Sequence, residues 1–233
     1  MKKFFTLVFA ALAFVGCNFF KDDPNEPVNY DALYCITSYQ SGEKISKTVY
    51  GEYTGLKEVR EQYVYKDNDW VYDYKIVIES TYDNNGNATH VKQSYYDESG
   101  ALDHAEEFRY ENIYDGSLLT ECYIEALQED GEWAKTQRLN LVYITESYLV
   151  SDIVYSDYNA EKEGYDIARK KSYSYYNGMT TFCEAAVYDA ASEKWTVISE
   201  TSYGYDNYSR LTAMQFDDKR TPAESTITAY YYQ

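Results

Sequence analysis

The stretch WVYDYKIVIESTYDNNG, residues 70–86, alternates apolar and polar side chains and then runs into a turn sequence. One set of alternate positions is mostly aromatic and aliphatic, namely Trp70, Tyr72, Tyr74, Ile76, Ile78 and Tyr82. The other set is more polar, namely Asp73, Lys75, Val77, Glu79 and Thr81. A period of two with one apolar face is typical of an antiparallel strand whose other face meets water. Asn85-Gly86 then predicts a type I′ hairpin, since these residues tolerate positive φ.

Similar stretches begin at Trp133 and Trp195, so the three tryptophans are almost evenly spaced along the chain. Each of the three tryptophans follows a turn that contains glycine, such as Asn177-Gly178 before Trp195. We interpret this spacing as an internal repeat of about 62 residues. Each repeat is long enough for four strands of about ten residues.

From residue 31 onward, segments rich in Tyr, Val, Ile and Thr alternate with clusters of Gly, Asn and Asp. About thirteen such turns separate about fourteen strands, and no stretch keeps a helical period. Short links make an antiparallel meander, and open sheets rarely exceed about ten strands. The sequence therefore predicts an all-β fold, a closed or nearly closed up-and-down barrel. The 30 tyrosines would fill an interior that is wider than that of an eight-stranded barrel.

The first residues have the pattern of a signal peptide. Lys2 and Lys3 precede an apolar run, residues 4–15, that is too short to span a bilayer. Gly16-Cys17 resembles a bacterial lipobox, although Phe14 stands where that motif usually has Leu. The resemblance implies cleavage before Cys17 and lipidation of its thiol; the alternative is an ordinary secretory signal. We therefore expect a signal peptide over 1–16, a tether over 17–30 and a single domain over 31–233.

The tether carries a second localisation signal. Lys21-Asp22-Asp23 resembles the export signal of Bacteroidota-type lipoproteins, which implies display on the outer face of the outer membrane; the alternative is a plain polar tether. With the repeats, the mature chain resembles uncharacterised Bacteroidota-type surface lipoproteins that form a soluble, porin-like barrel. Residues 82–89 and 96–100 also resemble the tyrosine-aspartate repeats of secreted shell proteins. These resemblances imply an anchor and a fold, and no functional residues.

Charge and cysteine content limit the partners. Removing residues 1–16 takes away two lysines, so 21 − 2 = 19 basic residues face 39 acidic ones, a net charge of −20. Nucleic acid and anionic lipid headgroups are poor partners for such a surface, and anchoring is expected from acyl chains. Cys122 and Cys183 would lie four strands, about 19 Å, apart, too far for a disulfide. We expect Cys35, Cys122 and Cys183 to be buried free thiols.

No catalytic motif is present, and we predict no enzyme activity, no cofactor and no metal site. His90 and His104 are the only histidines, and hairpin geometry places His90 opposite residues 107–109. Asp83-Asn84-Asn85-Gly86-Asn87 lacks the Gly and Glu positions of a calcium loop. Calcium at Asp67-Asn68-Asp69 or Asp217-Asp218 stays an alternative. With 39 acids, no carboxylate pair stands out as a glycosidase pair.

Trp70, Trp133 and Trp195 are the candidate ligand-binding residues. Each begins a strand, so each either starts the core face of its repeat or forms a stacking platform for sugar rings. The function predicted is a lipid-anchored, non-catalytic binding or interaction module, with a glycan or a surface protein as partner. The alternatives are a structural lipoprotein that packs with partner proteins and a carrier of an apolar ligand inside the barrel. A membrane-spanning barrel needs an apolar outer band, which Asp73, Lys75 and Glu79 on one strand face oppose.

Overall fold

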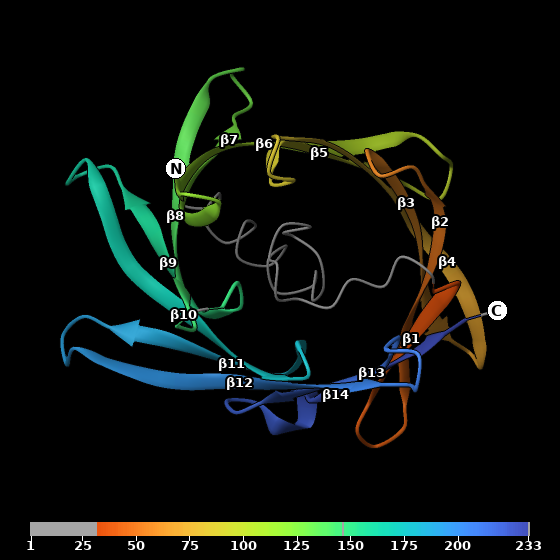
Figure 1. The fold of residues 1–233 in the computed structure, drawn as a ribbon. Coiled ribbons are helices and arrows are strands. Elements are labelled where there is room, and N and C mark those ends of the chain that lie inside the picture. Colours follow the sequence, from red (N-terminus) through yellow and green to blue (C-terminus); the bar gives the residue numbers. More distant parts are fainter. Residues whose placement is uncertain (1–31, 146, 233) are drawn as a thin grey trace.

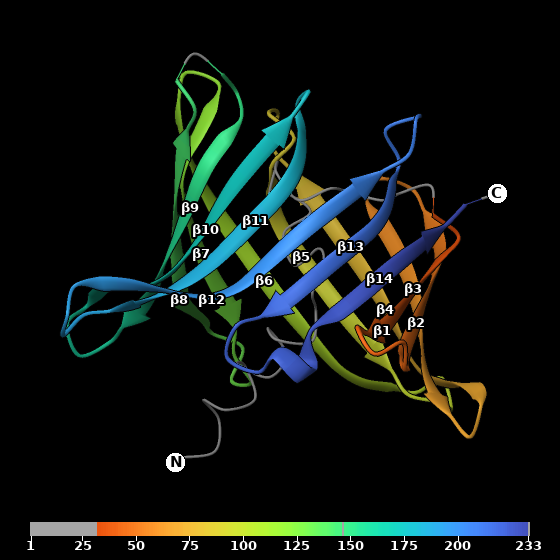
Figure 2. The same ribbon diagram turned by 90° about the horizontal axis from the view of Figure 1, so that it is seen from below.

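A closed barrel of antiparallel strands is shown by the structure, a computed structural model that describes residues 32–145 and 147–232. Figure 1 views it along the barrel axis and Figure 2 from the side. The strands are β1 (Tyr34–Tyr39), β2 (Lys44–Tyr53), β3 (Lys57–Lys66), β4 (Asp69–Tyr82), β5 (Ala88–Tyr96), β6 (Leu102–Asp115), β7 (Leu118–Leu127), β8 (Trp133–Tyr143), β9 (Val150–Asn159), β10 (Gly164–Tyr176), β11 (Met179–Asp189), β12 (Lys194–Tyr205), β13 (Leu211–Asp218) and β14 (Thr226–Tyr231). The predicted all-β meander of about fourteen strands is confirmed.

Each strand pairs with its neighbours in sequence, and β1 pairs with β14 to close the barrel, for example at Cys35 opposite Tyr230. Closure leaves no sheet edge exposed. The one helical turn of the described residues is the 3₁₀ segment η1 (Pro222–Glu224) between β13 and β14. No helix in the described ranges is long and apolar enough to cross a membrane. The predicted signal peptide, Cys17 and the tether lie outside the described residues.

The barrel has two rims of different build, at the top and the bottom of Figure 2. The upper rim comprises residues 32–33, residue 232 and, among the described residues, the loops 54–56, 83–87, 116–117, 144–145, 147–149, 177–178 and 206–210. The lower rim comprises the loops 40–43, 67–68, 97–101, 128–132, 160–163, 190–193 and 219–225. Several hairpins of the lower rim splay outward from the barrel wall (Figure 2).

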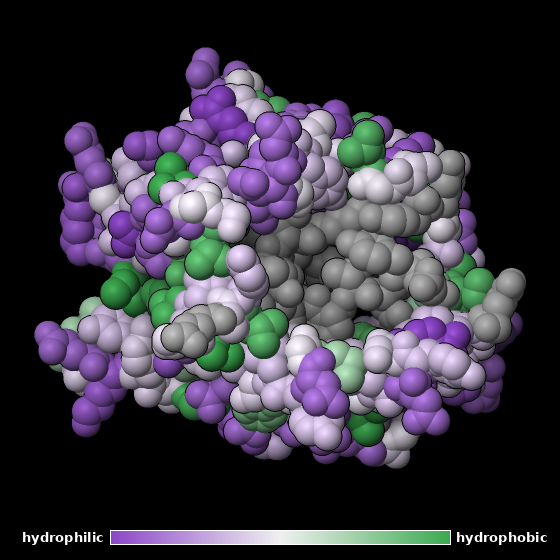
Figure 3. Space-filling view, viewed as in Figure 1, coloured by the Kyte–Doolittle hydropathy of each residue, from purple (hydrophilic) through white to green (hydrophobic). Residues whose placement is uncertain are grey.

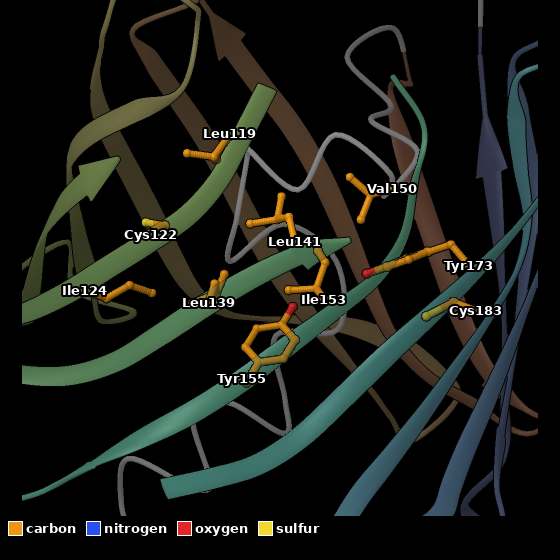
Figure 4. Close-up of a cluster of buried hydrophobic side chains, with 10 residues drawn as sticks. All are labelled: Leu119, Cys122, Ile124, Leu139, Leu141, Val150, Ile153, Tyr155, Tyr173 and Cys183. Carbon is orange, nitrogen blue, oxygen red and sulfur yellow. The ribbon is translucent and has the colours of Figure 1, made fainter. Parts of the chain in front are cut away.

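The interior wall carries the apolar residues. The largest cluster lies on β7 to β11, and Figure 4 shows its side chains. Its members are Leu119, Cys122, Ile124, Leu139, Leu141, Val150, Ile153, Tyr155, Tyr173 and Cys183. Two smaller clusters surround Ile76 and Tyr230. Cys35, Cys122 and Cys183 are all buried and free, as predicted.

Tyrosine hydroxyls tie the strands together along the upper rim. The tyrosine near the end of an even-numbered strand donates to a carbonyl at the start of the strand before it. The pairs are Tyr143 to Leu119 (2.8 Å), Tyr175 to Val150 (2.7 Å), Tyr205 to Thr180 (2.7 Å) and Tyr232 to Leu211 (2.5 Å). Burial raises the pKa of Tyr205 to about 12, so the phenol stays protonated as a donor. These side chains give backbone carbonyls of the barrel wall hydrogen-bond donors near the end of the neighbouring strand.

A second series of hydroxyls, from threonine and serine, also links neighbouring strands near the upper rim. Thr89, Thr120, Ser151, Thr181 and Thr212 each sit in a β-bulge one residue after an inward-facing strand start. Each donates its hydroxyl to a carbonyl of the preceding strand, at 3.1–3.3 Å. These positions recur about every 31 residues, once in each pair of strands.

One turn differs from the expectation. At Asn85-Gly86 only Gly86 has positive φ, 84°, and its N–H donates to the Asp83 carbonyl. The loop is therefore not type I′. Instead, the Asp83 carboxylate accepts hydrogen bonds from the backbone N–H groups of Asn85 and Asn87 and stabilises a longer turn. Asn177-Gly178 has both residues at positive φ, 51° and 79°, as the type I′ geometry requires.

The tyrosine ties yield a stability prediction. Tyr143→Phe and Tyr205→Phe keep the ring but remove the hydroxyl that donates to the carbonyl of Leu119 or Thr180. The loss of this hydrogen bond should lower the free energy of unfolding by about 1–2 kcal/mol in each variant. Tyr208→Phe is the control, because Tyr208 is 82% exposed and should change stability by under about 0.5 kcal/mol. Urea unfolding measures all three. Equal stability of the two buried variants and wild type would show that the ties contribute nothing.

Candidate functional site: cation-aromatic sites on the outer wall

The three tryptophans lie on the outer wall of the barrel, which corrects the prediction that Trp70 shares a face with Ile76. A β-bulge separates the two residues, since Tyr72 pairs with Tyr63 and Tyr74 pairs with Gln62, which leaves Asp73 unpaired. The extra residue turns every side chain before it to the opposite face. Tyr74 and Ile76 therefore join the interior cluster, whereas Trp70 and Tyr72 face outward.

The same device recurs at the other two tryptophans. Thr136 is skipped in the ladder of β7 and β8, and Ile198 is skipped in the ladder of β11 and β12. Each bulge comes three residues after its tryptophan, as Asp73 does after Trp70. The local sequence thus builds three equivalent sites, all on the outer face near the lower rim.

The Trp133 site is the most elaborate. The guanidinium carbon of Arg109, on β6, lies 4.7 Å from the centre of the indole ring, and the His90 ring on β5 stands edge-on to it at 6.2 Å. Arg109 is held in place by an ion pair of its Nε with the Glu125 carboxylate of β7. The site therefore presents an aromatic surface beside a fixed guanidinium donor group.

The Trp70 and Trp195 sites repeat this arrangement with lysine. Lys44 of β2 places its Nζ 5.8 Å from the Trp70 ring and 5.0 Å from Tyr65, whose ring meets Trp70 edge-on at 4.9 Å. Lys170 of β10 lies 5.3 Å from Trp195, whose other ring neighbour is Tyr188 at 5.1 Å. In all three sites the cation comes from the even-numbered strand before the one that carries the tryptophan.

A fourth site of the same build was missed by the sequence analysis. Tyr165 on β10 precedes the bulge at Ala168 by three residues, and Arg138 of β8 lies 5.5 Å from its ring. Tyr158 and Tyr123 are its ring neighbours at 5.3 and 5.6 Å. The signal was present, because Tyr165 lies about midway between Trp133 and Trp195, one strand pair from each. A pattern based on tryptophan does not include this site, because tyrosine stands here in place of tryptophan.

Charged pairs occupy the outer wall between these sites. Lys92 lies 2.8 Å from Glu107, whose second oxygen is 3.4 Å from His90. The hydrogen bond from Lys92 is the main reason why the pKa of Glu107 is lowered. Lys219, in the lower-rim loop after β13, contacts Glu200 of β12 at 2.7 Å. The middle of the outer wall is thus rich in ion pairs, unlike the apolar band of a membrane-spanning barrel.

The inward face of β6 carries a buried acid, Glu106. Glu106, next to Glu107, lies opposite Gln93, and its Oε2 is buried with no hydrogen-bond partner among the described residues. Burial raises the pKa of Glu106. Nearby, Glu58 and Arg60 form a buried ion pair at 2.6 Å. Polar groups therefore interrupt the apolar interior on β3, β5 and β6.

The remaining candidate residues do not come together. His90 pairs with Arg109 in the ladder, as predicted, whereas His104 lies opposite Tyr95 and stacks on its ring at 4.3 Å. No group of three metal-binding side chains occurs in residues 32–145 and 147–232. In the loop considered for calcium, the Asp83 carboxylate accepts hydrogen bonds from the backbone N–H groups of Asn85 and Asn87. It also accepts hydrogen bonds from the Asn112 side-chain amide and the Tyr114 hydroxyl. This set of donors gives Asp83 a structural role in the turn.

Comparison with known proteins finds no matching protein family and no matching curated protein. Among solved structures, the chain is similar to a porin-like protein from Bacteroides uniformis, with 9% identity, a TM-score of 0.43, and coverage of 89% of this chain and 99% of that one. A protein of unknown function from Bacteroides fragilis has 18% identity and a TM-score of 0.41, covering 54% of this chain and 91% of that one. A DUF3836 family protein from Parabacteroides distasonis has 9% identity and a TM-score of 0.37, covering 51% and 96%.

Glu106 and Glu107 make a matched pair for a pH test. The pKa of Glu106 is raised, so its ionisation costs stability at neutral pH, and Glu106→Gln should raise the free energy of unfolding at pH 7 by about 1 kcal/mol. The pKa of Glu107 is lowered, so its ionised form stabilises the fold, and Glu107→Gln should lower stability at pH 7 by under about 1 kcal/mol. Below about pH 4, where most Glu side chains are protonated in the unfolded chain, Glu106→Gln should converge on wild type. The effect of Glu107→Gln should disappear only at lower pH, as the pH falls through the lowered pKa of Glu107 in the folded protein.

Urea unfolding between pH 4 and pH 8 follows this divergence. Each variant serves as the other's control, since the substitution is the same and only the face of β6 differs. A destabilised Glu106→Gln variant at pH 7 would show that the interior carboxylate has a partner that stabilises its charge.

Proposed function

We propose that the protein is a non-catalytic, lipid-anchored surface module that binds polysaccharide through the aromatic sites of its outer wall. The supporting observation is the repetition of one site geometry at Trp70, Trp133 and Trp195, each beside a cation that a neighbouring strand positions. An aromatic ring offers an apolar face to the C–H groups of a sugar, and the adjacent cation donates hydrogen bonds to its hydroxyl or carboxylate oxygens.

The spacing of the sites favours a long ligand. The tryptophans start β4, β8 and β12, so neighbouring sites are four strands, or about 19 Å, apart along the wall. A polymer can reach two such sites at once, and the second contact then forms at high effective concentration. Weak individual sites therefore add up to useful affinity for a chain, whereas a monosaccharide gains nothing from the repetition.

The location of the sites agrees with attachment to a membrane by the N-terminal segment. They lie near the lower rim, the opposite end of the barrel from Ala32, the first described residue. The lipid anchor at Cys17 is supported by the sequence around Gly16-Cys17. Display on the cell surface is part of the same proposal, supported by Lys21-Asp22-Asp23.

Tryptophan variants of the full chain test the proposal. Binding to a panel of immobilised neutral and uronate-containing polysaccharides should fall about threefold to tenfold in Trp133→Ala, and more than additively in the triple variant with Trp70→Ala and Trp195→Ala, because the multivalent contact is lost. Tyr96→Ala is the matched control, since Lys75 lies 4.6 Å from this outer-wall ring away from any tryptophan site.

Two outcomes would contradict the proposal. In the first, wild type binds no polysaccharide of the panel. In the second, a triple variant that keeps the wild-type melting temperature still binds with wild-type affinity. A change in melting temperature with unchanged binding would assign the tryptophans to stability alone.

A further inference from the structure

The two rims differ in chemistry as well as in shape. Among the described residues, the upper-rim loops contain two acidic residues and one basic residue, whereas the lower-rim loops contain eleven acidic and three basic residues. The loop charges are therefore −1 and −8. The lower-rim loops therefore carry much more of the chain's negative charge than the upper-rim loops do.

The upper rim also exposes the large aromatic and aliphatic side chains that loops usually lack. Tyr208 is 82% exposed, Tyr148 77%, Tyr176 68% and Leu56 61%, each at the tip of a different loop or strand end. Leu33 and Tyr231 add further exposed apolar surface where the barrel chain begins and ends, at 41% and 40%. Figure 3 views this end of the barrel and shows hydrophobic side chains placed among hydrophilic ones around the mouth.

The covalent chain ties this same end to the N-terminal segment. Ala32 is buried at the upper rim, and the N–H of Leu33 donates to the Tyr231 carbonyl at 2.8 Å. Ala32 comes fifteen positions after Cys17, and a chain of this length reaches at most about 50 Å. An anchor at Cys17 therefore keeps Ala32, and with it the upper rim, within about 50 Å of the lipid surface.

We propose that the upper rim is a membrane-docking surface, on which the tips bearing Leu56, Tyr148, Tyr176 and Tyr208 rest at the lipid headgroup level. This inference rests on the membrane attachment proposed above. Tyrosine favours this boundary because its ring is apolar and its hydroxyl remains hydrated. Electrostatics select the end of the barrel: the lower rim, with eleven loop acids, is repelled by an anionic surface, and the repulsion is much weaker for the upper rim. Docking in this orientation directs the tryptophan sites away from the membrane.

Lipid-borne quenchers measure the orientation directly. The full chain is bound to vesicles of phosphatidylethanolamine and phosphatidylglycerol that contain a headgroup-level spin-labelled lipid, with a fluorophore on Tyr208→Cys or, as the matched control, on Ala190→Cys at an exposed lower-rim position. Cys35, Cys122 and Cys183 are 5–6% exposed and should stay unlabelled in the folded protein. The parent chain, treated identically, gives the background from any other thiol. Quenching at position 208 should exceed that at position 190 at least threefold.

A second variant tests the contact itself. The double variant Tyr176→Glu with Tyr208→Glu adds two negative charges at the upper-rim tips, and the probe is a fluorophore on Tyr148→Cys. Quenching of this probe should fall by at least half. The control variant, Ala190→Glu with Ser192→Glu at the lower rim, should leave the quenching unchanged. Equal quenching at positions 208 and 190, or stronger quenching at 190, would overturn the docking orientation while membrane attachment stands. Failure of the full chain to associate with the vesicles would overturn both the attachment and the docking that rests on it.

Discussion

The tyrosine hydroxyl that donates to a backbone carbonyl across the upper rim is the interaction on which the barrel depends. A barrel of fourteen strands encloses more space than aliphatic side chains can fill, and its buried backbone carbonyls need hydrogen-bond donors. Tyrosine answers both demands, because its ring is large and its hydroxyl reaches a backbone group, as Tyr205 reaches Thr180. The Thr181 hydroxyl, like those of the equivalent threonines and serine, donates to a carbonyl of the preceding strand. One strand pair with these two ties, repeated along the chain, generates the wall.

The bulges that complete this unit also separate the two faces of the barrel. Near the lower rim, the residue three positions after each tryptophan is skipped in the ladder, which turns the tryptophan outward beside a lysine or arginine. Without the bulge at Asp73, Trp70 would extend the interior cluster of Ile76. The same backbone irregularity that bends the hairpins therefore creates the candidate binding sites, so the fold and the proposed function share one structural origin.

The two ends of the barrel differ in chemistry because each kind of loop lies at one end only. Because strands alternate, every upper-rim loop follows an even-numbered strand and every lower-rim loop follows an odd-numbered one. The repeating sequence places Tyr, Asn, Gly and Ser at the first kind of loop and Asp and Glu at the second. A mouth with exposed tyrosines and a strongly acidic opposite end are the result, and the aromatic outer-wall sites lie near the acidic end.

The sequence by itself determined the strand periodicity, the turn positions, the count of about fourteen strands and the buried thiols, because each depends on local alternation or on composition. Closure by β1 and β14 followed from the strand number. Only the tertiary structure decided which face each tryptophan takes, because a single unpaired residue such as Ile198 reverses a strand's faces and leaves no mark in its alternation of side chains. The pairing of Arg109 with Trp133 and the collection of exposed tyrosines at one rim also depended on register and closure, which bring together residues that are far apart in the chain.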